Sequence, residues 1–439
     1  MRALAMLLTA PCLMAQQDFA QDSGRALLLQ VRKKVMATVD RLPRYLCTET
    51  VDRATLAPES TLTNGSCDYL AMRRQEPDWK VYPYTSDRLR LDVAVSSDHE
   101  MYSWAGEDRF GDRSLQDLVR SGATSTGAFA SFLTALFGTN VADFAYDGSM
   151  NVDGRALVSF GFHVPLENSG YRITNRRHSF LVPYEGKILV NPQTSDLVRL
   201  TVIANQLPAE LSACEDITTL DYGSVRLNNS EFLLPKEARL QVIYGTGSES
   251  VNRTVFSGCH EFTGESSLQF DPVLPDEAPT NKPAPAAVTL PANIRFRVMF
   301  TGEIDTATAA AGDLIRGELE GPIKINGDVV IPKKAAVTGR IVQVKRSYGR
   351  ASTMLAVGIK LETIEAHGTR QPFPAMLESR VKKPIRTSGA AAIARNLGSF
   401  DQMADPDAAS AGILEIPDVS EDYVIHRGLE MDGITTPSK

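Results

Sequence analysis

The side chains best suited to metal-ion or acid–base chemistry are scattered along this sequence. The six histidines lie far apart, and neither HEMYS (residues 99–103) nor HEFTG (residues 260–264) continues to the second histidine that a zinc-protease helix requires. The acidic residues show no calcium-loop spacing, and no glycine-rich loop follows a parallel strand to hold a phosphate. We therefore predict no metal site, no cofactor and no enzymatic activity.

One serine has some of the surroundings of a catalytic nucleophile. Ser125 lies in ATSTG, residues 123–127, a variant of the sharp turn that presents a nucleophilic serine between a strand and a helix. However, DLVRS (residues 117–121) is a poor candidate for the buried strand, and the pattern lacks the alternating strands and helices of a hydrolase sheet. A helix cap explains Ser125 equally well. A serine hydrolase is therefore the least favoured of three possible functions.

The cysteines indicate disulfide bonds rather than a metal site. Apart from Cys12 there are four, and no CxxC or HxxxH spacing accompanies them as it would at a zinc site. An even number in an exported chain favours two disulfides. Of the three possible pairings we favour Cys47–Cys67 and Cys214–Cys259, because each pair lies within one local run of expected strands.

The first fifteen residues have the pattern of a short secretory signal. MRALAMLLTAPCLMA begins with one arginine, continues as a short apolar run and ends at Ala15, a small residue suited to cleavage. Lipid attachment at Cys12 is an alternative, although Pro11 stands where a small residue is expected. No later stretch approaches the roughly 20 apolar residues of a membrane helix. We expect a periplasmic or secreted protein that is not integral to the membrane.

Length and composition are those of an ordinary globular protein. The 439 residues suggest two or three domains, and 43% hydrophobic and 23% charged residues allow packed cores. The formal net charge of −7 argues against a general nucleic-acid binder, which would need a basic surface to displace counterions from phosphates.

The elements that must position these residues are mostly strands. A first helix should start at Asp22 or Ser23 and end before Pro43, with one apolar stripe formed by Leu28, Val31, Val35, Val39 and Leu42. From Tyr45 to about Phe270, segments such as DRLRLDVAV (residues 87–95) alternate apolar and polar side chains. Because strands follow strands without regular helices between them, we predict a mainly β protein with a curved antiparallel sheet covered by helices.

One amphipathic helix should interrupt the strands. STGAFASFLTALFG, residues 125–138, is expected to be capped by Ser125 or Thr126 and to end at Gly138. Its apolar face carries four side chains at helical spacing: Phe129, Phe132, Leu133 and Leu136. They either fill the concave side of the sheet or line an apolar cavity in which a lipid chain replaces some helix contacts. They are our candidate ligand-binding residues.

The chain should divide at a proline-rich segment. DPVLPDEAPTNKPAPAAVTLPA, residues 271–292, is typical of a stiff, extended linker. It separates an α+β domain of residues 16–270 from a smaller all-β barrel or sandwich of residues 293–439.

Two features are expected within the smaller domain. Asn326-Gly327 between apolar runs predicts a tight hairpin. Residues 386–410, rich in small and polar side chains, predict a flexible insertion, and EDYVIHRGLEM (residues 421–431) predicts a closing strand.

Residues 184–200, YEGKILVNPQTSDLVRL, together with the first helix and the run of strands, resemble the periplasmic lipoprotein-carrier (LolA-like) family. That family has a strand pair of the type G-x-apolar-x-apolar-D-P-x-T-x-x-apolar-x-R, and Asn191 stands here where aspartate is usual. The resemblance covers roughly residues 20–270. It implies a half-closed sheet that wraps apolar helices and binds acyl chains.

The second domain resembles the β-barrel domain of type IV secretion channel proteins. Residues 309–344 follow that family's G-D-x-x-x-A and G-x-x-x-I-P-K-G-x-x-x-x-G pattern, with Lys334 in place of the second glycine of the latter. Only the barrel architecture is implied by this resemblance.

Taken together, these features favour an exported, non-enzymatic binding protein. Its first domain would hold a lipid or a lipoprotein acyl chain, and its second would contact an envelope protein. The alternative is a structural or protein-interaction module of the cell envelope with a filled core and no small ligand.

Overall fold

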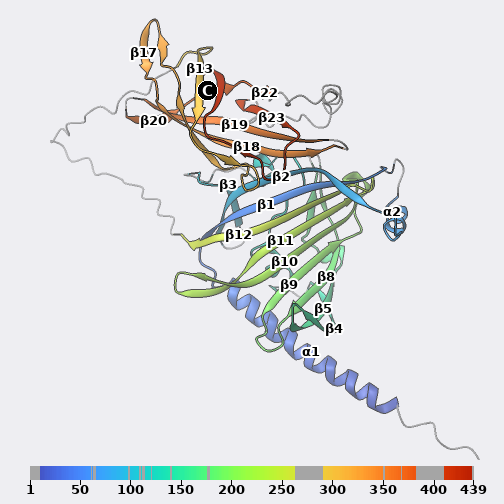
Figure 1. Cartoon of the computed structure of the whole chain (residues 1–439). Coiled ribbons are helices and arrows are strands. Elements are labelled where there is room, and N and C mark those ends of the chain that lie inside the picture. Colours follow the sequence, from blue (N-terminus) through green and yellow to red (C-terminus); the bar gives the residue numbers. More distant parts are fainter. Residues whose placement is uncertain are drawn as a thin grey trace, which may run out of the picture.

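The computed structural model of the chain is mainly β, as predicted, and consists of an N-terminal lobe (residues 10–262) and a C-terminal lobe (residues 290–437) (Figure 1). The structure describes residues 10–60, 62, 66–96, 99–107, 110, 114–119, 121–138, 141–175, 178–262, 290–349, 352–366, 368–381 and 410–437. Residues 271–289 of the expected linker (residues 271–292) lie outside the described residues. Residues 386–409 of the expected insertion (residues 386–410) also lie outside them.

The N-terminal lobe contains most of the helices. They are α1 (Ala10–Val39), α2 (Cys67–Arg73), α3 (Leu115–Leu118), α4 (Ser131–Leu133), the π-helical turn η1 (Thr134–Gly138) and the 3-10 turns η2 (Leu166–Asn168) and η3 (Ala209–Leu211). Its strands are β1 (Tyr45–Pro58), β2 (Val81–Ser96), β3 (His99–Trp104), β4 (Asp143–Val152), β5 (Arg155–Val164), β6 (Arg172–Thr174), β7 (Ser179–Leu181), β8 (Tyr184–Val190), β9 (Leu197–Ala204), β10 (Ala213–Leu227), β11 (Ser230–Tyr244) and β12 (Glu249–Glu261).

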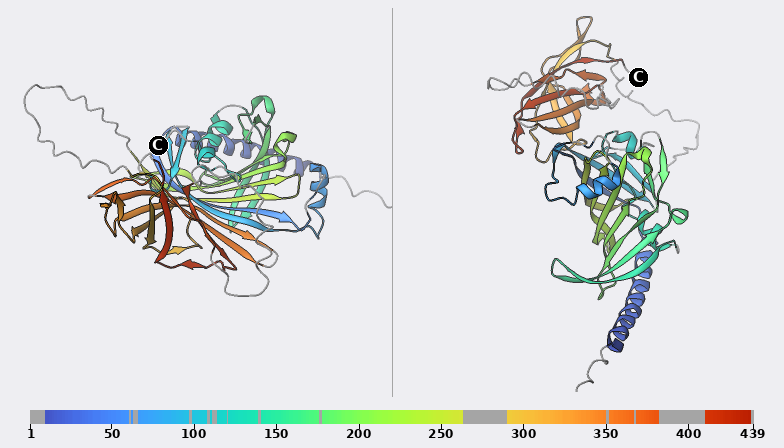
Figure 2. Two further views of the ribbon diagram at one scale, coloured as in Figure 1. Left: turned by 90° about the horizontal axis from the view of Figure 1, so that it is seen from above. Right: turned by 90° about the vertical axis from the view of Figure 1, so that its right-hand side faces the viewer.

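Ten of these strands form one antiparallel sheet. Their order is β4-β5-β8-β9-β10-β11-β12-β1-β2-β3. Alternation sets which side chains enter the core: in β2, Leu89, Leu91 and Val93 are buried, as the period of two predicts. The sheet curves around one face (Figure 2).

The concave face is covered by α1, α3, α4 and η1. Its core has two main parts. One gathers side chains of β5, β8, β9 and β10 beneath α1, α4 and η1, and the other gathers side chains of β1, β2 and β3 beneath α3 and Phe129. The sheet therefore has one buried face that needs a cover supplied by other elements.

Helix α1 begins earlier than predicted. It starts at Ala10, so Asp22 and Ser23 lie inside it rather than at a cap. Alanine, leucine, methionine and glutamine favour helix here, and Pro11 falls in the first turn, where a missing N–H costs nothing. The predicted apolar stripe is confirmed: Val31 and Val35 are buried. Residues 1–9 of the expected signal lie outside the described residues, and cleavage after Ala15 stays a prediction.

The helix predicted for residues 125–138 is shorter than expected. Residues 123–127 have no regular secondary structure, and helical structure runs only from Ser131 to Gly138, so neither Ser125 nor Thr126 caps it. Gly127 adopts a φ of +87°, a left-handed conformation that cannot belong to the first turn of an α-helix.

Two disulfides form as predicted, but their pairing was wrong. The bonds are Cys47–Cys259 and Cys67–Cys214, not Cys47–Cys67 and Cys214–Cys259. The prediction assumed local pairing, whereas β1 lies beside β12 in the sheet although 212 residues separate Cys47 from Cys259. The second bond joins the start of α2 to β10.

The C-terminal lobe is all β. Its strands are β13 (Arg295–Phe300), β14 (Ile304–Asp305), β15 (Leu314–Leu319), β16 (Ile323–Ile325), β17 (Asp328–Ile331), β18 (Ala336–Tyr348), β19 (Thr353–Ala366), β20 (Thr369–Pro372), β21 (Ala375–Leu377), β22 (Arg380–Val381), β23 (Gly412–Pro417), β24 (Val424–Ile425) and β25 (Leu429–Thr435). The strands pair in the order β21-β25-β13-β15-β18-β19-β23-β22, and β22 follows β21 directly along the chain. This lobe has a core of its own.

Two sequence predictions in this lobe can be compared with the structure. The Asn326-Gly327 hairpin joins β16 to β17 with positive φ at both residues, as predicted. The closing strand is β25, which begins at Leu429 and so lies further along the chain than residues 421–431 suggested.

The two lobes meet along the edge of β2. Residues 85–87 of β2 pair with residues 345–347 of β18. Further along β2, the Arg90 N–H donates to the Ala311 carbonyl at 2.7 Å, and the Ala311 N–H donates to the Arg88 carbonyl at 2.8 Å. β3 pairs with the remainder of β2. The C-terminal lobe thus covers an edge whose N–H and C=O groups would otherwise be unpaired.

Candidate functional site

The predicted ligand-binding residues lie in a segment that crosses the concave face. We call residues 121–138 the cover segment. Phe129, Phe132, Leu133 and Leu136 are all buried, as their spacing predicted. They divide between the two parts of the core: Phe129 packs with Tyr45 and Phe256, whereas Phe132, Leu133 and Leu136 pack beneath α1. A role in ligand binding stays a prediction for all four.

Side chains from the sheet hold the backbone of the cover segment. Arg53 Nη1 of β1 donates to the Ser121 carbonyl at 2.6 Å, and Asn252 Nδ2 of β12 donates to the Ala123 carbonyl at 2.7 Å. The Tyr222 hydroxyl of β10 donates to the Ala128 carbonyl at 3.3 Å. These bonds satisfy carbonyls that have no partner in regular secondary structure, so the irregular path of residues 121–128 is defined by the sheet beneath it.

Glu100 of β3 binds the same segment through its carboxylate. The Gly127 and Phe129 N–H groups donate to its two oxygens at 2.7 and 3.4 Å, and the Tyr102 hydroxyl donates at 2.7 Å. Charge-assisted bonds of this kind compete with the first turn of a helix for its N–H donors. This competition explains why the predicted helix does not begin at Ser125.

A second carboxyl group lies nearby in the core. Glu49 of β1 is 6% exposed. Burial, followed by the charge of Glu100, raises the pKa of Glu49 to about 8. Burial, followed by Glu49 and Glu100, also raises the pKa of the Tyr102 hydroxyl. This part of the core is therefore polar, and it favours a neutral Glu49 at neutral pH.

Ser125 does not have the surroundings of a nucleophile. It lies at a cavity of about 30 Å³ with Glu49, Thr218 and Asn252, room for about one water molecule. No histidine is among the described residues that line this cavity. Since residues 123–127 form neither a strand nor a helix start, the strand-to-helix turn suggested by the sequence was wrong.

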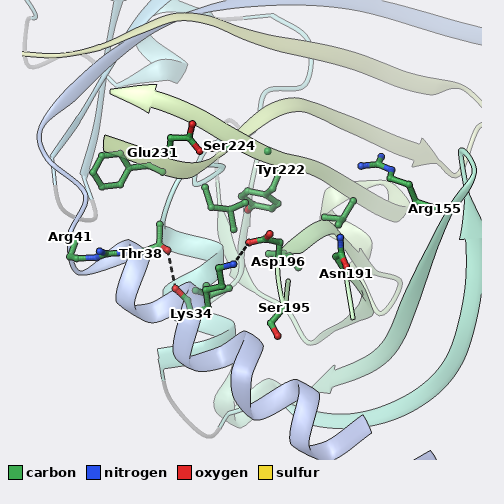
Figure 3. A pocket seen from close by; sticks show the side chains of 16 residues that line it. Lys34, Thr38, Arg41, Arg155, Asn191, Ser195, Asp196, Tyr222, Ser224 and Glu231 are labelled. Carbon is green, nitrogen blue, oxygen red and sulfur yellow. Dashed lines mark hydrogen bonds and ion pairs between the residues drawn. The ribbon is translucent and has the colours of Figure 1, made fainter. Parts of the chain in front are cut away.

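A larger cleft opens between α1 and the sheet (Figure 3). Its volume is about 420 Å³, within the range of small-molecule sites. Its walls are α1, the β8–β9 turn, the start of β5 and the β10–β11 hairpin. The lining residues are Lys34, Val35, Thr38, Arg41, Arg155, Asn191, Ser195, Asp196, Leu197, Val198, Tyr222, Gly223, Ser224, Glu231, Phe232 and Leu233.

The β8–β9 turn attaches α1 to one side of this cleft. Lys34 Nζ of α1 pairs with Asp196 Oδ1 at 2.7 Å and donates to the Thr194 carbonyl at 2.8 Å. The Ser195 hydroxyl donates to Gln30 Oε1 of α1 at 3.1 Å. These contacts are exposed, so they position the helix while contributing little stability. The turn belongs to the hairpin on which the carrier resemblance rests.

The floor of the cleft is continuous with the core under the cover segment. Val35, Leu197 and Tyr222 line the cleft, and all three belong to the cluster that contains Leu133 and Leu136. Tyr222 is also the residue that bonds the Ala128 carbonyl. The predicted residues Phe132, Leu133 and Leu136 thus share one apolar cluster with the cleft, whereas Phe129 lies apart from it.

Sequence reasoning missed the polar residues of this cleft. Lys34, Thr38 and Arg41 follow one another at helical spacing beside the buried stripe of Val31 and Val35, a signal that could have identified one wall. Arg155 had no such signal, because strand order alone brings β5 toward β10 through β8 and β9.

No protein-family model matches the sequence, and no curated protein matches it. Among the described residues, no helix combines the length and the apolar character that crossing a bilayer requires.

Solved structures give distant matches. A LolA superfamily protein from Nitrosomonas europaea is 9% identical, with a TM-score of 0.25, over 54% of this chain and 94% of its own. A DUF1329 family protein from Desulfovibrio piger is 10% identical, with a TM-score of 0.27, over 56% and 95%. A domain named for outer membrane lipoprotein sorting, from Vibrio parahaemolyticus, is 10% identical, with a TM-score of 0.28, over 55% and 95%. At these identities and scores the matches assign the chain to no family. The barrel resemblance of the C-terminal lobe stays a prediction.

Proposed function

We propose that the protein is an exported, non-enzymatic carrier whose N-terminal lobe binds an acyl chain on the concave face of its sheet. The observation that carries this proposal is the cleft beside α1. Its floor of Val35, Leu197 and Tyr222 belongs to the same apolar cluster as Leu133 and Leu136. A chain that entered the cleft would meet apolar surface continuously and would replace contacts of η1 with the sheet.

Burial of the chain provides the driving force for such an exchange. Burial of one methylene contributes about 0.8 kcal/mol, so about ten methylenes contribute on the order of 8 kcal/mol. Against this stand the packing lost when η1 moves and the entropy lost on association. Micromolar binding corresponds to about 8 kcal/mol of net free energy, so it requires a longer chain, of about 16 methylenes, whose burial contributes about 13 kcal/mol.

Binding is tested on the mature protein purified from the envelope. Mass spectrometry of extracted lipids should find a bound amphiphile, and a fluorescent fatty acid should bind saturably after the protein is delipidated. Leu233→Glu places a charge on the half-buried cleft wall and should abolish probe binding. Val329→Glu, at a position 52% exposed in the C-terminal lobe, is the matched control and should bind normally. Absence of both extracted lipid and saturable binding would reject the carrier function.

Export has its own test. Sequencing of the mature protein from the cell envelope should give an N-terminus at Gln16. A protein that keeps Met1 and fractionates with the cytoplasm would contradict export without bearing on ligand binding.

A second candidate function is a structural or protein-interaction module of the envelope. It is favoured by the β16–β17 hairpin, which projects from the C-terminal lobe and exposes Val329 (Figure 1). In that case the protein would hold no lipid, and Val329→Glu would reduce co-purification of an envelope partner while leaving the fold unchanged.

A further inference from the structure

The cleft beside α1 contains two cationic side chains that pair with no carboxylate in the part of the chain that the structure describes. Of its five charged residues, Lys34 pairs with Asp196 at 2.7 Å. Glu231 Oε1 lies 3.7 Å from Nη2 of Arg226, a residue outside the cleft. Glu231 also accepts a hydrogen bond from the Ser224 hydroxyl. The other two, Arg41 and Arg155, form no ion pair with any carboxylate of the described residues.

The two arginines come from different walls. Arg41 follows the end of α1, and its Nε donates to the Ala37 carbonyl at 2.8 Å. Arg155 is the first residue of β5, and its guanidinium points into the cleft above Asn191 (Figure 3). Between them lies the apolar floor. The cleft therefore presents cations at its rim and hydrocarbon at its base.

We propose that this cleft recognises the anionic headgroup, a carboxylate or a phosphate, of an acyl amphiphile. The inference rests on the proposed acyl-chain binding and adds the class of ligand. Arg155 donates to the headgroup oxygens, Arg41 adds positive potential from the opposite wall, and the chain lies along Val35, Leu197 and Leu233 toward the cover segment. The planar fork of a guanidinium matches the paired oxygens of carboxylate and phosphate.

The rim of the cleft is open to solvent, so the strength of the headgroup interaction should depend on salt concentration. Exposed charges are screened at separations beyond about 10 Å in 0.1 M salt. The headgroup contribution should therefore weaken as salt is added, whereas burial of the chain should not. A neutral ligand with the same chain should show no such dependence on salt.

The experiment uses the full mature chain and two probes that share one acyl chain, a free fatty acid and its methyl ester. We expect the acid to bind about tenfold more tightly at low salt, the size of one charge-assisted hydrogen bond. Arg155→Gln should remove most of that difference and Arg41→Gln a smaller part of it, and both should leave ester binding unchanged. Arg295→Gln, whose side chain is 85% exposed in the C-terminal lobe, is the matched control and should change neither probe.

Each outcome separates the two proposals. Equal binding of acid and ester, unaffected by either arginine variant, overturns the headgroup inference and leaves acyl binding intact. Binding of neither probe overturns both. Inorganic phosphate distinguishes a lipid headgroup from a free anion: it should displace the fatty acid only at far higher concentration, and displacement at equal concentration would overturn the inference in favour of a simple anion site.

Discussion

The two ends of the N-terminal sheet are constructed differently. At the disulfide end, formed by β12, β1, β2 and β3, the Cys47–Cys259 bond joins neighbouring strands and the C-terminal lobe covers the edge of β2. At the helix end, formed by β4, β5, β8 and β9, α1 and η1 lie on the sheet, and no disulfide of the described residues reaches these strands.

The difference lies in the kind of contact that each end uses. Charged and hydrogen-bonding side chains of the disulfide end, among them Arg53 and Glu100, bind the backbone of the cover segment in a defined geometry. The helix end relies on apolar packing and on the exposed Lys34–Asp196 pair. Apolar contacts can be exchanged for those of a ligand, whereas a buried charge that loses its partner is costly. The disulfide end is thus suited to fix the shape of the sheet, and the helix end to accommodate a ligand.

The largest effect should come from removing the bond that defines the disulfide end. Cys47→Ala with Cys259→Ala opens a loop across 212 residues, for which the chain-entropy model gives a loss of about 5 kcal/mol in the free energy of unfolding. Cys67→Ala with Cys214→Ala should cost less, because that bond attaches the short helix α2 and its loop lies inside the first. Urea unfolding of both double variants measures the difference. Equal losses would show that the disulfide end has no special role.

Truncation of one apolar residue at each end sharpens the comparison. Phe129→Ala should lower the free energy of unfolding by about 4 kcal/mol, because the ring packs between Tyr45 and Phe256. Leu136→Ala at the helix end should cost about 3 kcal/mol. Denaturant unfolding measures both.

The two variants should differ more clearly in ligand binding. Leu136→Ala should raise the affinity for a fluorescent fatty acid, because the apolar cavity it leaves can take part of the chain. Phe129→Ala should leave that affinity unchanged. If instead Phe129→Ala alters binding and Leu136→Ala does not, the ligand belongs to the disulfide end and the assignment of roles is reversed.

The contact between the lobes should also contribute to the disulfide end. Arg340 of β18 is 3% exposed and donates to Glu362 Oε1 at 2.7 Å and, across the interface, to the Ala105 carbonyl at 2.7 Å. Arg340→Met should lower the free energy of unfolding by about 3 kcal/mol, because it leaves Glu362 and a carbonyl without their donor. Arg346→Met is the matched control, since the buried Arg346 side chain donates only within the C-terminal lobe, and the substitution leaves its backbone pairing with Ser86 of β2 in place.

Hydrogen exchange separates these two arginine variants. Arg340→Met should increase exchange in both β18 and β2, whereas Arg346→Met should increase it in the C-terminal lobe alone. Unchanged exchange in β2 after Arg340→Met would mean that the lobes are not energetically coupled.

Alternation and turn residues predicted the strands well because both act locally. Leu89, Leu91 and Val93 face the core, and Asn326-Gly327 forms its hairpin, as a few neighbouring residues dictate. The disulfide pairing could not be obtained in this way, since it depends on β1 lying beside β12 at the far end of the lobe sequence. The start of the helix in the cover segment was missed for a similar reason: Glu100, on another strand, takes the N–H group of Gly127.

The candidate site was predicted only in its apolar half. The spacing of Phe132, Leu133 and Leu136 identified side chains that do share one cluster. Arg155, at the start of β5, reaches the cleft through the order of strands in the sheet, which the sequence leaves open. Apolar periodicity is a property of one element, whereas a polar cleft is shared between several.

The smallest expected effect is a pH dependence at the disulfide end. The pKa of Glu49 is raised to about 8 in the folded protein, first by burial and then by Glu100, from an ordinary value near 4.5. The folded state therefore binds a proton more tightly than the unfolded state. The resulting stabilisation is complete below about pH 4.5 and is lost as the pH rises toward 8. Glu49→Gln, which keeps a neutral side chain, should lack this slope.

Urea unfolding at pH 5.5, 7 and 8.5 measures the effect as a difference between the variant and the parent. One pKa unit corresponds to about 1.4 kcal/mol, so we expect Glu49→Gln to gain on the order of 2 kcal/mol over the parent between the lowest and the highest pH. Glu167→Gln, at an exposed position on η2, is the matched control and should follow the parent. If the Glu49→Gln and parent curves ran parallel, the carboxyl would be charged and hydrated at all three pH values, and the disulfide end would be as accessible to water as the cleft at the helix end.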